Sequence, residues 1–274
     1  MLGQLKPSII FKLKKFAIEL PAEHLLPEYQ RQHAQYDKFL PILVKYLEQK
    51  SIVVDIGANV GDSLAAMVEQ NIDVSYICIE ADDFFFQFLE KNVLTVKHAI
   101  EGVNVEIIQA LVGKSISGVY LEGKDGSKHA VKSLDGGITS QPLDEILLNV
   151  PRISLLKSDV DGFDYDVIDS SMGLIQKYKP ILYFECQYAD EIQRAGYLHT
   201  ITQLNALGYG DWTVFDNFGA KMLRTENVEI VLQMLNYVWN QNIKNSTRTI
   251  YYLDILVVQK SESELIDKVL SEYS

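Results

Sequence analysis

The sequence predicts an α/β fold built around a mostly parallel sheet. From residue 51 onward, short and nearly continuous apolar runs alternate with amphipathic stretches, which is typical of a parallel sheet with helices on both faces. The tail departs from this alternation, because its two apolar runs have no strand–helix–strand unit between them. We expect those two runs to pair antiparallel at one edge of the sheet.

Five apolar runs are the expected parallel strands. They are IVVDIG (52–57), VSYICIE (74–80), VEIIQALV (105–112), ISLLKSD (153–159) and PILYFE (180–185). Helical spacing of apolar residues predicts helices at about 61–70, 82–93, 164–177 and 198–207. The antiparallel pair is WTVFDN (212–217) and YYLDILVVQ (251–259), with a helix expected at 226–240. SGVYLEG and SKHAVKSL flank the turn KDG and indicate a hairpin before the fourth main strand.

The pattern divides the chain into an N-terminal helical extension or cap (1–50), a main domain (51–260) and a C-terminal helix (261–274). Within the main domain, residues 224–249 are expected to form a helical insertion. We interpret SIIFKLKKFAIEL, near the N-terminus, as a helix. It could be a basic amphipathic helix that lies on a membrane surface, or it could pack on its own domain, and we favour packing.

Composition excludes some classes of partner. The 274 residues carry a net charge of −12, and the chain after residue 50 carries −15, which repels nucleic acid. No apolar run reaches the ~18–20 residues of a transmembrane segment, and Lys12, Lys14 and Lys15 interrupt the only N-terminal apolar stretch. Cys78 and Cys186 lie in strand-like segments, as buried thiols do in a reducing cytoplasm, where we place the protein. The oligomeric state is left open.

The segment VVDIGANVGDSLA (53–65) predicts a ligand-binding loop. It runs from a strand through a glycine-rich turn into a helix, and ligands of open α/β sheets bind at the carboxyl ends of the strands. Gly57 and Gly61 permit sharp turning and a close approach of the backbone to a ligand. The free N–H groups of the following helix favour an anionic group.

The spacing of the glycines in this loop limits the classes of ligand that it can bind. A dinucleotide fingerprint needs GxGxxG, but Ala58 and Asn59 stand where the second glycine would be, and no P-loop is present. Asp55 suits an ammonium group, and Glu80, at the end of the second strand, suits the hydroxyls of a ribose. Ammonium, carboxylate and ribose together describe S-adenosylmethionine. The alternative is a tight turn with an acidic helix cap. An antiparallel last strand also agrees better with a methyltransferase sheet than with a dehydrogenase sheet.

Three blocks of sequence resemble the FkbM family of S-adenosylmethionine-dependent methyltransferases. They are VVDIGANVGDSLA (53–65), CIEADDFFFQFLEKN (78–92) and LLKSDVDGFDYDVIDSS (155–171). ILYFE, FDNFG and YYLDILVV are similar to the weaker later blocks, so the resemblance covers residues 50–260. Ser158, where the family usually has an apolar residue, and the 224–249 insertion depart from the pattern.

The resemblance implies a Rossmann-like class I methyltransferase fold, with a seven-stranded, mostly parallel sheet whose last strand is antiparallel. It also implies O-methylation, in many members on a sugar hydroxyl of a polysaccharide, glycolipid or natural product. The motif positions would hold the methionine end, the ribose and the adenine of the cofactor. These positions are, in that order, Asp55, Gly57, Asn59 and Gly61; Glu80, Ala81 and Asp82; and Gln109 and Ala110.

The candidate catalytic residues are Asp159, Asp161 and Glu185, at the carboxyl ends of the fourth and fifth strands. Because a sugar hydroxyl is hardly ionised at neutral pH, one of them could act as a general base, or together they could bind Mg²⁺. The alternative is that Asp161 and Asp164 cap the next helix while Lys157 offsets their charge. Secondary candidates are His33 and His199 as bases, and Trp212, Trp239 and Tyr188 as surfaces for a sugar ring.

Two other functions remain in view. A methyltransferase-like domain could bind a ligand or a protein without turnover, although the intact cofactor loop argues against this. An NAD-dependent enzyme is disfavoured by the missing GxGxxG. The fourth strand ends in SDVDGF instead of [DN]PP[YF], which argues against methylation of nucleobases or of glutamine amides. The expected partner is therefore a small-molecule or glycan hydroxyl acceptor.

Overall fold

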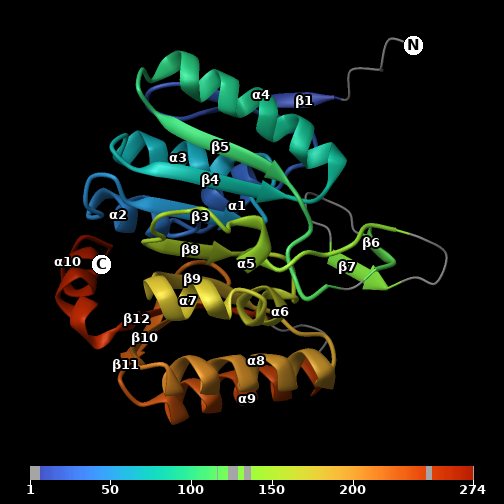
Figure 1. Cartoon of the computed structure of the whole chain (residues 1–274), viewed down its shortest axis with the longest axis vertical. Coiled ribbons are helices and arrows are strands. Elements are labelled where there is room, and N and C mark those ends of the chain that lie inside the picture. The colour runs from blue at the N-terminus through green and yellow to red at the C-terminus, as the bar shows by residue number, and fades with distance from the viewer. Residues whose placement is uncertain (1–6, 116, 123–128, 133–136, 245–248, 274) are drawn as a thin grey trace.

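An eight-stranded sheet forms the centre of the molecule in the computed structural model, which describes residues 7–115, 117–122, 129–132, 137–244 and 249–273 (Figure 1). Its strand order is β11-β10-β12-β9-β8-β3-β4-β5. The strands in chain order are β3 (Ile52–Ile56), β4 (Ser75–Glu80), β5 (Asn104–Gln109), β8 (Leu155–Ser158), β9 (Ile181–Cys186), β10 (Tyr209–Asp216), β11 (Lys221–Thr225) and β12 (Leu253–Gln259).

The direction of the strands confirms the Rossmann-like class I methyltransferase fold. Strands β5, β4, β3, β8 and β9 are parallel neighbours, and β12 is antiparallel to both β9 and β10. The expected antiparallel pair is confirmed at that side of the sheet, where β12 inserts between β9 and β10, but the pair does not form the outermost edge. An eighth strand, β11, covers the edge of β10. Its sequence KMLRT is largely polar and partly exposed, so it lacks the apolar signal of the other strands.

Helices cover both faces of the sheet, and the alternation of side chains along each strand separates two cores. Val53 and Leu155 face one core, whereas Val54 and Leu156 face the other. The helices over the first face are α2 (Phe39–Lys45), α3 (Asp62–Gln70), α4 (Asp83–Ala99) and α10 (Ser263–Tyr273). Those over the second are α5 (Leu143–Ile146), α6 (Asp164–Asp169), α7 (Met172–Tyr178), α8 (Glu191–Ala206) and α9 (Val228–Lys244). None of the helices in these described ranges is long and apolar enough to cross a membrane.

The expected helix over SIIFKLKKFAIEL is wrong, because this segment forms an antiparallel hairpin of β1 (Ser8–Lys12) and β2 (Ala17–Pro21). Its burial alternates with a period of two, since Ile18 and Leu20 are buried whereas Ala17 and Glu19 are half-buried. The pattern of a strand with one buried face therefore prevails over helical spacing. The single helix expected after Tyr29 is also divided, into α1 (Leu26–Gln32) and α2.

Other expectations hold with local changes. The helix predicted at 164–177 is divided into α6 and α7, where the hydroxyls of Ser170 and Ser171 donate to the Val167 carbonyl (2.8 and 2.6 Å). The predicted hairpin is formed by β6 (Val119–Glu122) and β7 (His129–Lys132), although its KDG turn lies outside the described residues. A 3₁₀ turn, Lys260–Glu262, precedes α10 within the expected C-terminal helix.

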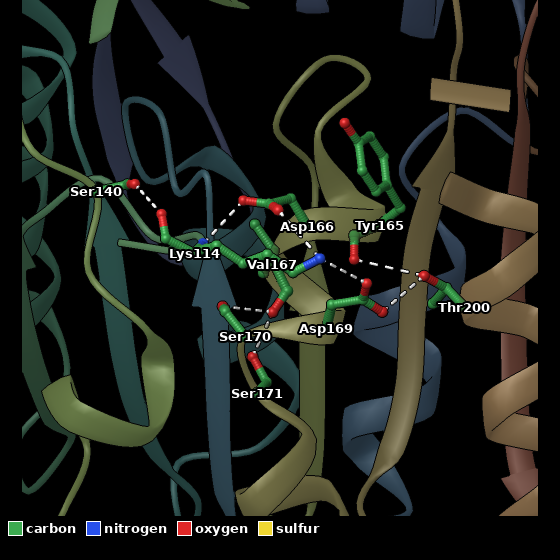
Figure 2. A network of polar contacts seen from close by, with 9 residues as sticks. All are labelled: Lys114, Ser140, Tyr165, Asp166, Val167, Asp169, Ser170, Ser171 and Thr200. Carbon is green, nitrogen blue, oxygen red and sulfur yellow. Dashed lines mark hydrogen bonds and ion pairs between the residues drawn. The ribbon is translucent and has the colours of Figure 1, made fainter. Parts of the chain in front are cut away.

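A polar network fixes the chain that follows β5 (Figure 2). The backbone N–H of Lys114 donates to Asp166 (2.9 Å), and the Lys114 ammonium lies 3.0 Å from Asp169 on α6. Thr200 on α8 donates to the other oxygen of Asp169 (3.0 Å). The network therefore ties the segment after Gln109 to two helices of the second face.

Asn92 connects three segments that are distant in sequence. This residue of α4 is 2% exposed, and its amide donates to the carbonyls of Val60 and Glu19, each at 2.8 Å. Its carbonyl accepts from the Glu19 N–H, also at 2.8 Å. One side chain thereby holds the hairpin β1–β2 and the glycine-rich loop against the same helix.

We predict that Asn92→Ala lowers the free energy of unfolding by about 3 kcal/mol, because buried backbone groups of Val60 and Glu19 lose their partners. Urea unfolding followed by circular dichroism measures the loss. Asn104→Ala is the matched control, since the Asn104 amide makes a hydrogen bond with Ser75 at the surface and its loss costs less than about 1 kcal/mol. Equal losses in the two variants would contradict this role of Asn92.

Candidate active site

A row of side chains crosses the sheet on the face that carries α2 and α3. In the strand register, Asp55 on β3 lies beside Lys157 on β8, and Lys157 lies beside Tyr183 on β9. Two residues further along β9, Glu185 lies opposite Asp254 on β12. Since side chains two residues apart share a face, the strand ends direct all five toward one region.

Lys157 and Asp55 form a buried ion pair beneath the glycine-rich loop. The Lys157 ammonium lies 2.9 Å from Asp55 Oδ1, and the two side chains are 5% and 1% exposed. The ammonium also donates to the Gly57 carbonyl (3.2 Å) and lies 3.6 Å from Asp159. Burial opposes the charge on Lys157, but the facing carboxylates outweigh it and raise the pKa of Lys157, so the ammonium stays charged. The ammonium expected beside Asp55 thus comes from the chain itself.

The glycine-rich loop turns closely over the end of β8. Gly57 has φ +72°, and a Cβ there would lie 1.9 Å from the Asp159 carbonyl oxygen, so only glycine fits. Asn59 also has a positive φ, +49°, and α3 begins after Gly61 at φ +81°. The N–H groups of Gly57 and Ala58 donate to the Ile79 carbonyl (2.9 and 3.0 Å), which fastens the loop to β4.

Glu80 lies on the other side of this loop, at the end of β4. One carboxylate oxygen accepts from the Asn59 N–H and the other from the Asp82 N–H, each at 2.8 Å. Burial is the main cause that raises the pKa of Glu80, and these N–H donors oppose the rise. The N–H of Ala110 donates to the Glu80 carbonyl (3.2 Å), and Gln109 makes a hydrogen bond with Asp83. The residues predicted for ribose and adenine therefore gather around Glu80.

A cavity of about 320 Å³ lies between the sheet face and the N-terminal segment. Five of the predicted site residues line it: Gly57, Asn59, Asp159, Asp161 and Glu185. Seven do not: Asp55, Gly61, Glu80, Ala81, Asp82, Gln109 and Ala110. The opposite wall comes from the N-terminal segment, and further walls come from the strand ends and α10. The residues that sequence reasoning missed there are His24, Tyr29, Tyr36, Asp37, Tyr183, Tyr251, Tyr252, Asp254 and Tyr273.

The three candidate catalytic acids differ in their surroundings. The Asp159 side chain is 53% exposed, whereas Glu185 is 6% exposed and its Oε2 has no hydrogen-bond partner among the described residues. Burial, followed by the charge of Asp159, raises the pKa of Asp161. The neighbouring Asp164 is buried and accepts from Ser158 Oγ (2.6 Å), which gives the unusual Ser158 a structural role. Asp164 also accepts from the Val160 N–H (3.2 Å), so it holds the loop and does not cap α6.

The expected magnesium site finds no support. Within the described residues, no group of three or more acidic, histidine or cysteine side chains is placed to hold a metal ion. The acids that line the cavity come from separate strand ends and loops. The described residues at this site therefore give no support to a bound divalent ion.

The secondary candidates have other roles. His33 stacks on Phe218, with ring centroids 3.8 Å apart, and His199 is exposed on α8, so neither lines the cavity. Trp212 and Tyr188 are buried in the core of the second face, and Trp239 packs against Tyr188. The expectation that they stack on a sugar is wrong. Of the tyrosines that do line the cavity, the pair Tyr251 and Tyr252 before the last strand had the clearest sequence signal.

The strand order and the glycine-rich loop are those of the class I methyltransferase fold. The chain belongs to the FkbM family, because residues 55–210 match the family model described as the methyltransferase FkbM domain. No curated protein matches the sequence. The resemblance inferred from the sequence blocks is confirmed.

Two solved structures show how far this chain differs from known relatives. Methyltransferase FkbM from Methylobacillus flagellatus KT is 12% identical with a TM-score of 0.42, over 85% of this chain and 58% of that chain. An O-methyltransferase from Bacillus cereus, in complex with S-adenosylhomocysteine (SAH), is 12% identical with a TM-score of 0.49, over 88% and 84% of the two chains. This chain thus spans 58% of the FkbM protein that it resembles.

We predict that Gly57→Ala lowers the free energy of unfolding by about 3 kcal/mol or more, since a methyl group there meets the Asp159 backbone. Gly102→Ala is a matched control, because Gly102 also has a positive φ, +84°, but has nothing within 4 Å of an added Cβ. The control therefore reports backbone strain alone, about 1 kcal/mol. Chemical unfolding of both variants makes the comparison, and losses of equal size would contradict the close approach at Gly57.

Proposed function

We propose that the protein is an S-adenosylmethionine-dependent O-methyltransferase that methylates a hydroxyl of a sugar-like acceptor. The observation that carries the proposal is the cavity, in which the glycine-rich loop and the unpaired carboxyl of Glu185 share one space. We call the part of the cavity lining that comes from the N-terminal segment and from the tyrosines and acids at the strand ends the outer wall. A donor held by the loop and an acceptor held by the outer wall would meet beside that carboxyl. The unpaired Glu185 favours an enzyme over a domain that only binds.

The glycine-rich turn and Glu80 fit parts of the donor, whereas Asp55 is paired with Lys157 and is not available for the donor ammonium. Glycine at position 57 leaves open the space that any side chain would fill, and the turn 57–61 leads into the N-terminus of α3, which suits a carboxylate. Glu80 is 8% exposed, and each of its oxygens uses one lone pair for a backbone N–H, so acceptor capacity remains for ribose hydroxyls. Gln109 and Ala110 lie beside it, where we expect the adenine.

The chemistry needs alignment and a proton acceptor. S-adenosylmethionine supplies an activated methyl group on a positively charged sulfur. The cavity walls orient the acceptor hydroxyl, and Glu185 is the candidate placed best to take its proton, because its Oε2 is buried and unpaired. Asp159 is largely exposed and close to Lys157, and Asp161 lies in a turn at φ +51°, so these two are better placed to bind acceptor hydroxyls.

The outer wall fits a neutral or positively charged polyhydroxyl compound. It combines tyrosines with carboxylates from the N-terminal segment and the strand ends, a set that stacks on sugar rings and accepts hydrogen bonds from hydroxyls. Lys157, the one lysine or arginine among the described residues that line the cavity, is already paired with Asp55. Cys78 and Cys186 are free and buried, which agrees with a reducing compartment, and we propose the cytoplasm.

Isothermal titration with SAH tests the donor site directly. We expect binding to the wild type and an affinity about tenfold or more lower for Glu80→Ala, because charge-assisted hydrogen bonds to the ribose are lost. Glu106→Ala, an exposed glutamate on the neighbouring strand β5, is the matched control and leaves the affinity unchanged. If SAH does not bind at millimolar concentration, the proposed function is wrong. An unchanged affinity of Glu80→Ala would mean that other residues hold the ribose.

A further inference from the structure

The carboxyl group of Glu185 is in an unusual state. It lies at the end of β9, is 6% exposed and has an oxygen without any hydrogen-bond partner in the described part of the chain. An ionised carboxylate in such a place is costly unless a positive charge is near. Burial, followed by the carboxylates around it, raises the pKa of Glu185 well above its usual range and so favours its neutral form while no positive charge is near.

Among the described residues that line the cavity, Lys157 is the one lysine or arginine, and His24 is the one histidine. Lys157 lines the same cavity, but its ammonium is engaged by Asp55 and the Gly57 carbonyl. Carboxylates or neutral groups make up the rest of the surroundings. The other titratable groups that face Glu185 are Asp159 and Asp161 after β8, Asp164 on α6, Cys186 on β9, Tyr197 on α8, and Tyr252 and Asp254 at β12.

The donor differs from its product by one positive charge, since the sulfur is charged in S-adenosylmethionine and neutral in SAH. Glu185 shares its cavity with Gly57 and Asn59, the loop residues at the methionine end of the proposed donor site. On the basis of the proposed function, we propose that Glu185 ionises only while the charged donor is bound, and that it takes the acceptor proton as this charge disappears.

The step balances in atoms and charge. The acceptor oxygen forms a bond to the methyl carbon, the carbon–sulfur bond breaks with its electron pair left on sulfur, and the hydroxyl proton passes to Glu185 Oε2. Before the step, the cavity holds one positive charge and the Glu185 carboxylate; afterwards, it holds a neutral thioether and a neutral acid. In neither state is the Glu185 carboxylate left without a compensating positive charge. The proton leaves for solvent when the next donor binds.

Proton release on binding tests this inference without any acceptor. Titration calorimetry in two buffers of different ionisation enthalpy counts the protons exchanged on binding. At about pH 6 the amino groups of both ligands are protonated, so they do not contribute to the count. We expect the wild type to release about one proton with S-adenosylmethionine and almost none with SAH. Its affinity for S-adenosylmethionine also rises by up to about tenfold per pH unit relative to SAH.

Two variants assign the proton to Glu185. Glu185→Gln keeps the shape of the side chain and loses the release with S-adenosylmethionine, whereas Glu106→Gln on β5 behaves as the wild type. If Glu185→Gln does not fold, the comparison of the two ligands on the wild type can still overturn the inference, because it requires that only the charged donor releases a proton. Equal proton counts for the two ligands would overturn the inference and leave the proposed function standing. If neither ligand binds, the proposed function fails and the inference falls with it.

Discussion

The ion pair between Lys157 and Asp55 is the constraint on which the site depends. Burial of two charges costs free energy that their mutual attraction must offset, and loss of either partner leaves the other charge unpaired in the interior. Here the ammonium meets Asp55 at 2.9 Å and the Gly57 carbonyl at 3.2 Å, so one cation fixes both a strand and the loop that leaves it. Asp55 and Lys157 are register neighbours on β3 and β8, so the pair also joins these two strands near their carboxyl ends.

This arrangement decides where the cavity can form. With Gly57 drawn over the Asp159 backbone, the ends of β8 and β9 open toward the N-terminal segment, which packs as the opposite wall. Phe39 packs at a tilt against Phe215 and edge-on against Tyr273 (centroids 4.6 and 5.3 Å apart), so an aromatic cluster anchors this wall. This N-terminal wall lies outside residues 55–210 of the family match.

The parts of the candidate site that lie within one short stretch of sequence could be predicted from that stretch. Gly57, Asn59 and Glu80 could be predicted because a strand, a turn and a helix follow one another within a short stretch, and the ends of parallel strands share an edge. The partner of Asp55 could not, since Lys157 lies about a hundred residues away and only the strand register brings them together. The tyrosine wall was missed for the same reason. The N-terminal hairpin was mistaken for a helix because its apolar residues satisfy both periods, and only packing on α4 decides between them.

A double-mutant cycle on the ion pair tests the account most directly. Lys157→Met and Asp55→Asn, each alone, should lower the free energy of unfolding by about 3–5 kcal/mol, since each leaves a buried charge without its partner. The double variant should cost clearly less than the sum of the two, because no unpaired charge remains. Urea unfolding of the four proteins measures this coupling. Losses that simply add would show that the two charges do not depend on each other, and would contradict the central role given to the pair.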